Sequence, residues 1–317
     1  MLGLILLLMV LASGCGGNGS GGENASDTDV VEIISDENGF YSYDGYIIKA
    51  DYPMDEASLE KAAGKMATIY EQFLKGKEIN TYFAIVPDKN AYVTEVEGNE
   101  APQIMDYAAL TEKMKSQTEF ASYIEIADLL ELSDYYKTDA HWKQEKISDV
   151  AARIAESMGN ELKAEYEEVR AKEDFVGAYS RQTELEMQAE PFVYLDSPIL
   201  EGCTLTDFET NSEIPLYNET KLAGTEGEGY DMFLGGSKSL LTIENPAADA
   251  DKELIVFRDS FGSSIAPLFA ESYGKITLVD IRYLPSATLD RFIEFKDGQD
   301  VLFLFSTPVL NNSVTMK

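Results

Sequence analysis

The sequence predicts a single α/β domain with a mainly parallel central sheet. In the last third of the chain, the apolar runs "ELIVF", "KITLVDI" and "VLFLFS" are rich in β-branched and aromatic residues, and helix-like segments separate them. Continuous apolar strands of this kind are typical of parallel sheets that helices cover on both faces. Hydrophobic residues make up 44% of the 317 residues, which is enough for one sizeable core.

The N-terminal segment "MLGLILLLMVLASGC" predicts export from the cytoplasm. It is apolar, is too short to span a bilayer comfortably and ends in small residues before a cysteine. Ala12, Ser13 and Gly14 before Cys15 resemble a bacterial lipobox, so we expect residues 1–14 to be a signal peptide and Cys15 to be lipidated. A plain signal peptide and a residual membrane anchor are the alternatives.

Residues 15–34 contain "GGNGSGGENASDTD", and this composition predicts a flexible tether. The domain over residues 35–317 would then lie outside the cytoplasm, anchored by its lipid to the bacterial cell membrane.

The first half of the domain alternates strand and helix signals. "YDGYIIKADY" predicts a strand or hairpin, and a stripe of apolar residues predicts a helix that Asp55 caps and Gly76 ends. "TYFAIVP" and "YIEIADL" predict short strands, with a helix over 104–116 between them. The apolar stripe of the helix between Asp55 and Gly76 is formed by Leu59, Ala62, Ala63, Met66, Tyr70, Phe73 and Leu74.

The second half begins with another amphipathic helix, which Gly159 ends. Residues 160–250 have weaker periodicity and predict short strands and loops that cover a site. In the C-terminal third, "IAPLFAESYG" predicts a helix between two strands. The helix that Gly159 ends has an apolar stripe that consists of Ile147, Val150, Ala151, Ile154, Ala155 and Met158.

The charge balance disfavours nucleic acid as a partner. The chain has 57 acidic and 25 basic side chains and a formal net charge of -32. Binding to phosphates needs clustered Lys and Arg, so we expect no nucleic-acid partner. An anionic polymer could bind only through a local basic pocket.

Cysteine and metal chemistry are weakly indicated. With Cys15 lipidated, Cys203 is the only other cysteine, so no internal disulfide can form. "LEGCTLTDF" offers no adjacent base, and Cys203 is interpreted as a small buried residue rather than a nucleophile. One histidine matches no zinc spacing, although a calcium site of oxygen ligands stays open in so acidic a chain. We expect no metal and no cofactor.

"RDSFGSS" lies where a buried strand turns into a helix. In open α/β folds, ligands bind at this carboxyl edge of the sheet, and the first amides of the helix could receive an oxyanion. Ser260 in this motif is a candidate nucleophile. A serine here is also a preferred helix cap, so the motif alone leaves both interpretations open.

The only histidine, His141, lies two residues after Asp139 and directly before the only tryptophan, Trp142. In an extended segment both side chains would leave the same face, and the carboxylate could fix the imidazole tautomer. Structural packing is the alternative for a lone histidine beside a tryptophan. With Ser260, however, the pair completes a triad in which a base activates the hydroxyl and a carboxylate orients the base.

"YYKTDAHW" resembles the D-x-H-W signature of the DHHW proteins and of the alginate acetylation proteins AlgX and AlgJ, whose shared domain is SGNH-hydrolase-like. "VFRDSFGSSIAPLF" resembles the second block of that family. "YDMFLGG" and "ITLVDIRYL" resemble further DHHW segments, and the resemblance runs from about residue 35 to the end. It implies an SGNH-hydrolase-like three-layer α/β fold, with Ser260 as nucleophile, His141 as general base and Asp139 as its orienter.

Four further residues are candidates for binding substrate. Basic side chains are scarce in this chain, so Arg258 and Arg282 could hold substrate, or else form ion pairs. Tyr136 and Trp142, with Tyr135, could form an aromatic wall that stacks on sugar rings, or else pack in the core.

The resemblance implies O-acetyl chemistry on a cell-surface polysaccharide or exopolysaccharide. The activity would be that of an O-acetyltransferase or an acetylesterase, through an acetyl-serine intermediate. A membrane-bound O-acyltransferase is the expected partner that supplies acetyl groups. The alternatives are a non-catalytic carbohydrate-binding lipoprotein and a solute-binding lipoprotein, the second of which predicts two lobes with a hinge and no triad.

Overall fold

The computed structural model describes residues 34–93, 105–223 and 229–317. The predicted signal peptide, Cys15 and nearly all of the tether lie outside these residues. In what is described, the largest element is an eight-stranded sheet. Its strands are, in spatial order, β5 (Ser122–Ile124), β4 (Asn80–Val86), β13 (Asp300–Ser306), β11 (Glu253–Arg258), β12 (Lys275–Val279), β10 (Leu240–Glu244), β8 (Thr204–Asp207) and β9 (Ser212–Ile214).

The sheet is mainly parallel, as predicted. The strands from β5 to β12 pair in parallel, whereas β10, β8 and β9 extend the sheet in antiparallel fashion. The continuous apolar run of β13 has a direct cause, because alternate side chains of this strand enter two different cores. Val301, Phe303 and Phe305 lie in one core, and Leu302 and Leu304 in the other.

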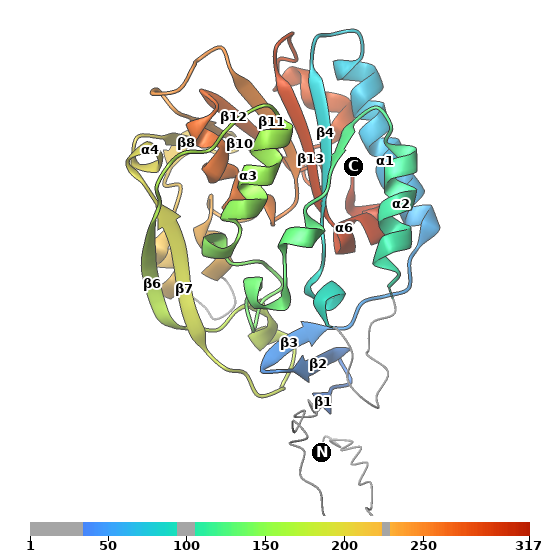
Figure 1. Ribbon diagram of the computed structural model, residues 1–317, viewed down its shortest axis with the longest axis vertical. Coiled ribbons are helices and arrows are strands. Elements are labelled where there is room, and N and C mark those ends of the chain that lie inside the picture. The colour runs from blue at the N-terminus through green and yellow to red at the C-terminus, as the bar shows by residue number, and fades with distance from the viewer. Residues whose placement is uncertain (1–33, 94–104, 224–228) are drawn as a thin grey trace, which may run out of the picture.

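Helices cover both faces of the sheet (Figure 1). On one side lie α1 (Glu56–Ile69) and α2 (Tyr107–Gln117), and on the other lies α3 (Ser148–Ser157). Asp55 caps α1 as predicted, since its carboxylate accepts the Ser58 N–H at 3.1 Å. A π-helical turn continues α1 to Leu74, and Gly76 then has a φ of 82°.

Two expected elements are not formed as the sequence suggests. "YIEIADL" supplies only the last two residues of β5, Tyr123 and Ile124, before a 3₁₀ turn at Ala127–Leu129. The helix expected over "IAPLFAESYG" is not formed: the single turn α5 (Gly262–Ile265) ends at the first residue of this segment, and 3₁₀ turns follow over Ala266–Glu271, where Pro267 has no N–H to donate. Two other short helices, α4 (Pro198–Glu201) and α6 (Thr307–Asn311), begin with proline in the first turn.

Two smaller β-structures flank the sheet. β1 (Ile34–Ser35), β2 (Phe40–Tyr43) and β3 (Tyr46–Lys49) form an antiparallel sheet, which lies below the central sheet in Figure 1. β6 (Glu167–Phe175) pairs with β7 (Glu190–Asp196) as a ribbon on the left of that view. The β3 strand contacts the segment just before the D-x-H-W motif, because the Ile47 N–H donates to the Lys137 carbonyl at 2.7 Å.

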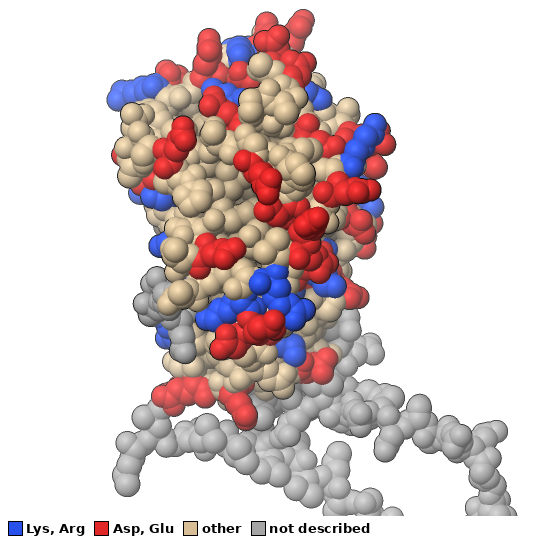
Figure 2. Space-filling view, turned by 90° about the vertical axis from the view of Figure 1, so that its left-hand side faces the viewer, with Lys and Arg blue, Asp and Glu red and all other residues tan. Residues whose placement is uncertain are grey.

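None of the helices in the described part of the chain has the length and apolar composition that crossing a membrane requires. Figure 2 turns the side that carries β6 and β7 toward the viewer. Acidic side chains are spread over most of this face, and basic side chains gather toward its lower part.

Candidate active site

Ser260 follows β11 at the carboxyl edge of the sheet, as the sequence predicts. Asp259 fixes the turn, because its two carboxylate oxygens accept the Phe261 N–H at 3.0 Å and the Ser306 N–H at 2.7 Å. The residue before α5 is Phe261, and no side chain caps this helix. The structure therefore excludes the helix-cap interpretation of Ser260, whose hydroxyl is left for another partner.

His141 is that partner. Its Nε2 lies 2.7 Å from the Ser260 hydroxyl oxygen, and its Nδ1 lies 2.6 Å from Asp139 Oδ1. The segment is a tight turn rather than an extended segment, because Tyr135 bridges Trp142 and the Tyr136 N–H donates to the His141 carbonyl. The turn still brings the predicted three side chains into one hydrogen-bonded chain.

Asp139 is buried, with 1% of its surface exposed. Burial acts to raise the pKa of this carboxyl, but the adjacent imidazole and the His141 and Ala178 N–H groups outweigh it and lower the pKa below its usual value. An ionised Asp139 accepts the Nδ1 proton and leaves Nε2 free to accept from Ser260.

Residues 135–142 form the turn that contains the D-x-H-W motif, and we call it the motif turn. The tryptophan next to the histidine joins this turn to the helix after Ser260. Trp142 Nε1 and the Tyr230 hydroxyl both donate to Ser264 Oγ at 2.8 Å. The Tyr230 ring also stacks on the imidazole of His141, with centroids 3.7 Å apart and planes 6° apart. Gln144 adds a bond from Nε2 to the Ser264 carbonyl at 2.6 Å.

Lys89 stabilises the motif turn through two hydrogen bonds to its backbone. This buried amine donates to the carbonyls of Tyr136 at 3.1 Å and Asp139 at 2.9 Å, and burial lowers its pKa to about 8. We did not single out Lys89, Gln144 or Tyr230 from the sequence. The available signals were that Lys89 closely follows a buried strand and that Tyr230 opens the "YDMFLGG" segment.

Three of the four residues predicted to bind substrate, Tyr136, Trp142 and Arg258, are wrong predictions, because the structure buries their side chains. Tyr136 and Trp142 have no exposed surface and pack in the cores, as Tyr135 does. Arg258 is 1% exposed because it ends a strand that is buried on both faces, and it donates to the Asp259 carbonyl and Ser263 Oγ. Arg282 forms a bidentate ion pair with Asp280.

The triad opens into a cavity of about 180 Å³. Three residues of the "YDMFLGG" segment, Tyr230, Asp231 and Gly236, form part of its wall. None of Arg258, Arg282, Tyr136 or Trp142 lines it. The lining residues are Asp139, His141, Ala178, Tyr230, Asp231, Gly236, Ser237, Ser260 and Ser263.

Cys203 is half-buried, and burial raises the pKa of its thiol to about 11, which disfavours a thiolate nucleophile. Within the described residues, no group of three or more His, Cys, Asp or Glu side chains could hold a metal ion.

The chain has the fold of several solved structures. A DHHW family protein from Eubacterium siraeum is 21% identical, with a TM-score of 0.69 over 88% of this chain and 94% of that chain. PatB1 from Bacillus cereus, solved with a sulfonyl adduct, is 17% identical, with a TM-score of 0.63 over 89% of this chain and 97% of that chain. The O-acetyltransferase domain of AlgJ from Pseudomonas putida is 13% identical, with a TM-score of 0.50 over 89% of this chain and 92% of that domain.

No family model and no curated protein matches the chain. The likeness to solved structures therefore concerns the fold. It confirms the predicted three-layer α/β fold and the resemblance to DHHW and AlgJ-like structures that the motifs indicated.

Proposed function

We propose that this chain, which has the fold of a DHHW family protein, is an extracytoplasmic serine O-acetyltransferase or acetylesterase that acts on cell-surface polysaccharide. The observation that carries the proposal is the hydrogen-bonded chain from Asp139 through His141 to Ser260. A serine hydroxyl becomes a nucleophile when a base removes its proton and a carboxylate orients that base. A solute-binding or purely carbohydrate-binding lipoprotein has no need of this arrangement.

In the first half-reaction, Ser260 Oγ attacks the carbonyl carbon of an acetyl ester while His141 Nε2 takes the hydroxyl proton. The tetrahedral intermediate collapses, the leaving alkoxide receives that proton from the imidazolium, and acetyl-Ser260 remains. In the second half-reaction, a sugar hydroxyl or water gives its proton to His141 and attacks the acetyl carbon. The bond from that carbon to Ser260 Oγ then breaks, and the serine oxygen takes the proton from the imidazolium, which restores the free triad. A sugar acceptor gives transfer, and water gives ester hydrolysis.

The Ser260 backbone N–H is a donor for the oxyanion, because no group in the described part of the chain accepts from it. The next two amides are already used, by the carboxylate and the carbonyl of Asp259 respectively. Ser263 offers a second donor. Its Oγ accepts from Arg258, so its own hydroxyl proton is available to the cavity that it lines.

The proposed location rests on the N-terminal sequence. A lipid at Cys15 and the tether that follows would hold the domain at the outer face of the cytoplasmic membrane. A membrane-bound O-acyltransferase could deliver acetyl groups to such a domain, and nascent polysaccharide would be within its reach.

Hydrolysis of an activated acetyl ester by the full-length protein tests the proposal. We expect Ser260→Ala and His141→Ala to lower kcat/KM by about 10⁴-fold or more, and Asp139→Asn to lower it by about 10⁴-fold, because the amide selects the wrong tautomer. A sulfonyl fluoride should inactivate the wild-type protein and label the peptide that contains Ser260.

Ser116→Ala, at an exposed serine on α2, is the matched control and should keep the wild-type rate. Circular dichroism checks that each variant is folded. Equal rates in all of these proteins would reject an enzyme and favour the non-catalytic carbohydrate-binding alternative.

A further inference from the structure

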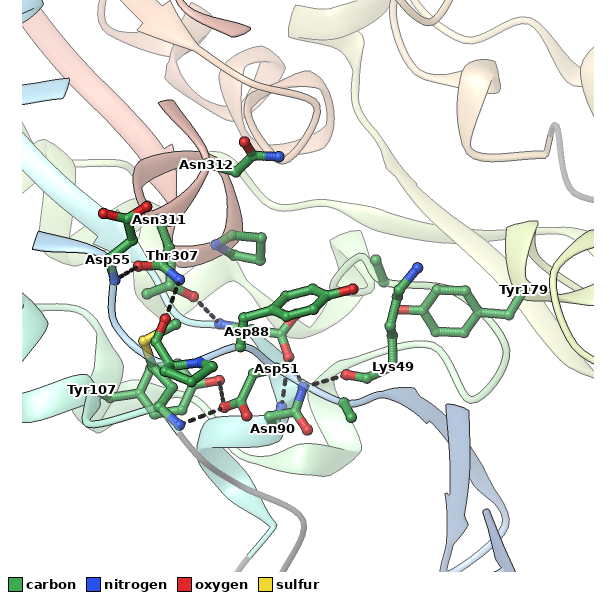
Figure 3. Close-up of a pocket in the computed structure, with 16 residues that line it drawn as sticks. Lys49, Asp51, Asp55, Asp88, Asn90, Tyr107, Tyr179, Thr307, Asn311 and Asn312 are labelled. Carbon is green, nitrogen blue, oxygen red and sulfur yellow. Dashed lines mark hydrogen bonds between the residues drawn. The ribbon is translucent and has the colours of Figure 1, made fainter. Parts of the chain in front are cut away.

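A second and larger cavity, of about 540 Å³, lies beside the triad cavity. Figure 3 shows the residues that line it. We call it the sheet-edge hollow. Figure 3 shows Asp51, Asp88 and Asn90 close together in its middle, with the rings of Tyr107 and Tyr179 on opposite sides. The residues that matter here are Asp51, Tyr52, Asp88, Tyr107, Tyr179 and Asn312, all of which line it.

The sheet-edge hollow and the triad lie next to each other because of the strand order. Asp88 follows β4, Thr307 follows β13 and Ser260 follows β11, and these three strands are parallel neighbours. The carboxyl ends of such strands meet at one edge of the sheet, where ligands bind in open α/β folds.

The motif turn separates the two cavities by a single residue. Ala140 lines the sheet-edge hollow, whereas its neighbours Asp139 and His141 line the triad cavity. A chain-like ligand bound at Ser260 therefore has a second cavity immediately available on the other side of this turn.

The lining of the hollow has the chemistry that suits an uncharged sugar ring. Tyr52 is 67% exposed and offers a flat face for stacking. Asp88 uses Oδ1 for both bonds from Asn90, and its Oδ2 accepts no hydrogen bond from any described residue. Such an acceptor suits a sugar hydroxyl, which is a donor.

The charge of the lining argues against an acidic sugar. Three carboxylates, those of Asp51, Asp55 and Asp88, line the hollow together with the ammonium group of Lys49. The molecule as a whole has a net charge of -32. A uronic acid unit would bring another carboxylate into this field, whereas a neutral ring brings only hydroxyl donors and apolar C–H faces.

We propose that the sheet-edge hollow binds an uncharged sugar unit of the same glycan strand whose neighbouring unit is acetylated or deacetylated at Ser260. This inference rests on the proposed function, since it supplies the subsite that would select the polysaccharide.

Calorimetric titration of N-acetylated chitotetraose, cellotetraose and tetragalacturonate into full-length Ser260→Ala protein tests the inference. We expect at least one neutral tetrasaccharide to bind, and tetragalacturonate to bind at least tenfold more weakly. In the same background, Tyr52→Ala and Asn312→Ala should each weaken binding of the neutral sugar about fivefold. Tyr283→Ala, at an exposed tyrosine outside the hollow, is the matched control and should change nothing.

Three outcomes would overturn the inference: no binding of either neutral sugar, binding that both hollow variants leave unchanged, or equal affinity for tetragalacturonate. Because the titrations use protein without the nucleophile, they are independent of the ester assay. Sugar binding without ester hydrolysis in wild-type protein would reject the proposed enzyme activity but support sugar binding in the hollow. Hydrolysis without sugar binding would support the enzyme activity and reject the hollow as a sugar site.

Discussion

At the scale of single residues, three parts of the chain hold the imidazole of His141 in place. Asp139 bonds one ring nitrogen, Ser260 bonds the other, and Tyr230 stacks on the ring face. Lys89 adds a fourth support by holding the carbonyl of Asp139. The imidazole has little freedom to rotate, which is the state in which a general base transfers a proton efficiently.

Glu145, in the 3₁₀ turn after the motif, predicts a pH-dependent stability. Burial raises the pKa of its carboxyl from 4.5 to about 7, and its Oε2 has no hydrogen-bond partner in the described part of the chain. Between these pH values the folded protein holds a proton that the unfolded chain has released, so stability falls as the pH rises through this range. We expect Glu145→Gln to raise the melting temperature clearly at pH 8 and little at pH 5.

Thermal unfolding of both proteins at the two pH values checks this prediction. An exposed substitution, Glu112→Gln on α2, is the control and should show no such difference between pH values. The same gain for Glu145→Gln at pH 5 and pH 8 would contradict the assigned cause.

The residue types of the triad could be predicted from the sequence, but the substrate-binding residues could not. His141 was the only histidine available, and an aspartate two residues before it reaches the imidazole in a turn as well as in an extended segment. Arg258 and Trp142 were chosen for scarcity and ring area, yet burial decides whether a side chain meets a ligand, and burial depends on strands that are distant in sequence. The contacts of Lys89 depend on such approaches as well.

At the scale of elements, the loop before the 3₁₀ turn Ala178–Arg181 presses against the motif turn. The Gly177 N–H donates to Thr138 Oγ1 at 2.8 Å, and a Cβ added at Gly177 would lie 2.5 Å from Asp139 Cβ and 2.8 Å from the Thr138 carbonyl oxygen. Alanine at this position must displace one of the two turns. We expect Gly177→Ala to lower kcat/KM for ester hydrolysis about tenfold or more and to reduce stability by about 1–3 kcal/mol.

Gly64→Ala is the control for this prediction, because the same change within a helix should stabilise the protein. Gly64 is exposed in the middle of α1, and an added Cβ meets nothing within 4 Å. This change should raise the free energy of unfolding by about 0.5–1 kcal/mol and leave the ester rate unaltered. Urea denaturation and ester kinetics measure both variants, and a wild-type rate in Gly177→Ala would contradict the packing argument.

The burial of each element explains which elements the sequence predicts well. Strands buried on both faces, such as β11 and β13, are continuous apolar runs and were found. The ribbon strand β6 reads "EEVRAKEDF" and is mostly exposed, so neither apolar alternation nor a continuous run marks it. Bulges in its pairing with β7 disturb the period further.

At the scale of the whole molecule, the net charge of -32 predicts a salt-dependent stability. Like charges spread over a folded surface repel one another more strongly than in the expanded unfolded chain, and the repulsion weakens as the screening length falls. We expect the melting temperature at pH 7.5 to rise when NaCl is increased from 20 mM to 300 mM. Near pH 4.2, the isoelectric point of the sequence, the increase should be much smaller. A fall at pH 7.5 would mean that the surface ion pairs outweigh the repulsion.

The strand order also has a consequence for biosynthesis. β13 comes last of all the described strands in the chain, yet it lies between β4 and β11, and the N–H of its last residue, Ser306, fixes the turn before the nucleophile. A ribosome must therefore deliver the chain as far as Ser306 before the middle of the sheet can close. Until then the serine and its base, which are 119 positions apart, have no scaffold to unite them. If the chain is exported as we propose, it would travel without an assembled triad and gain one only after β13 has joined the sheet.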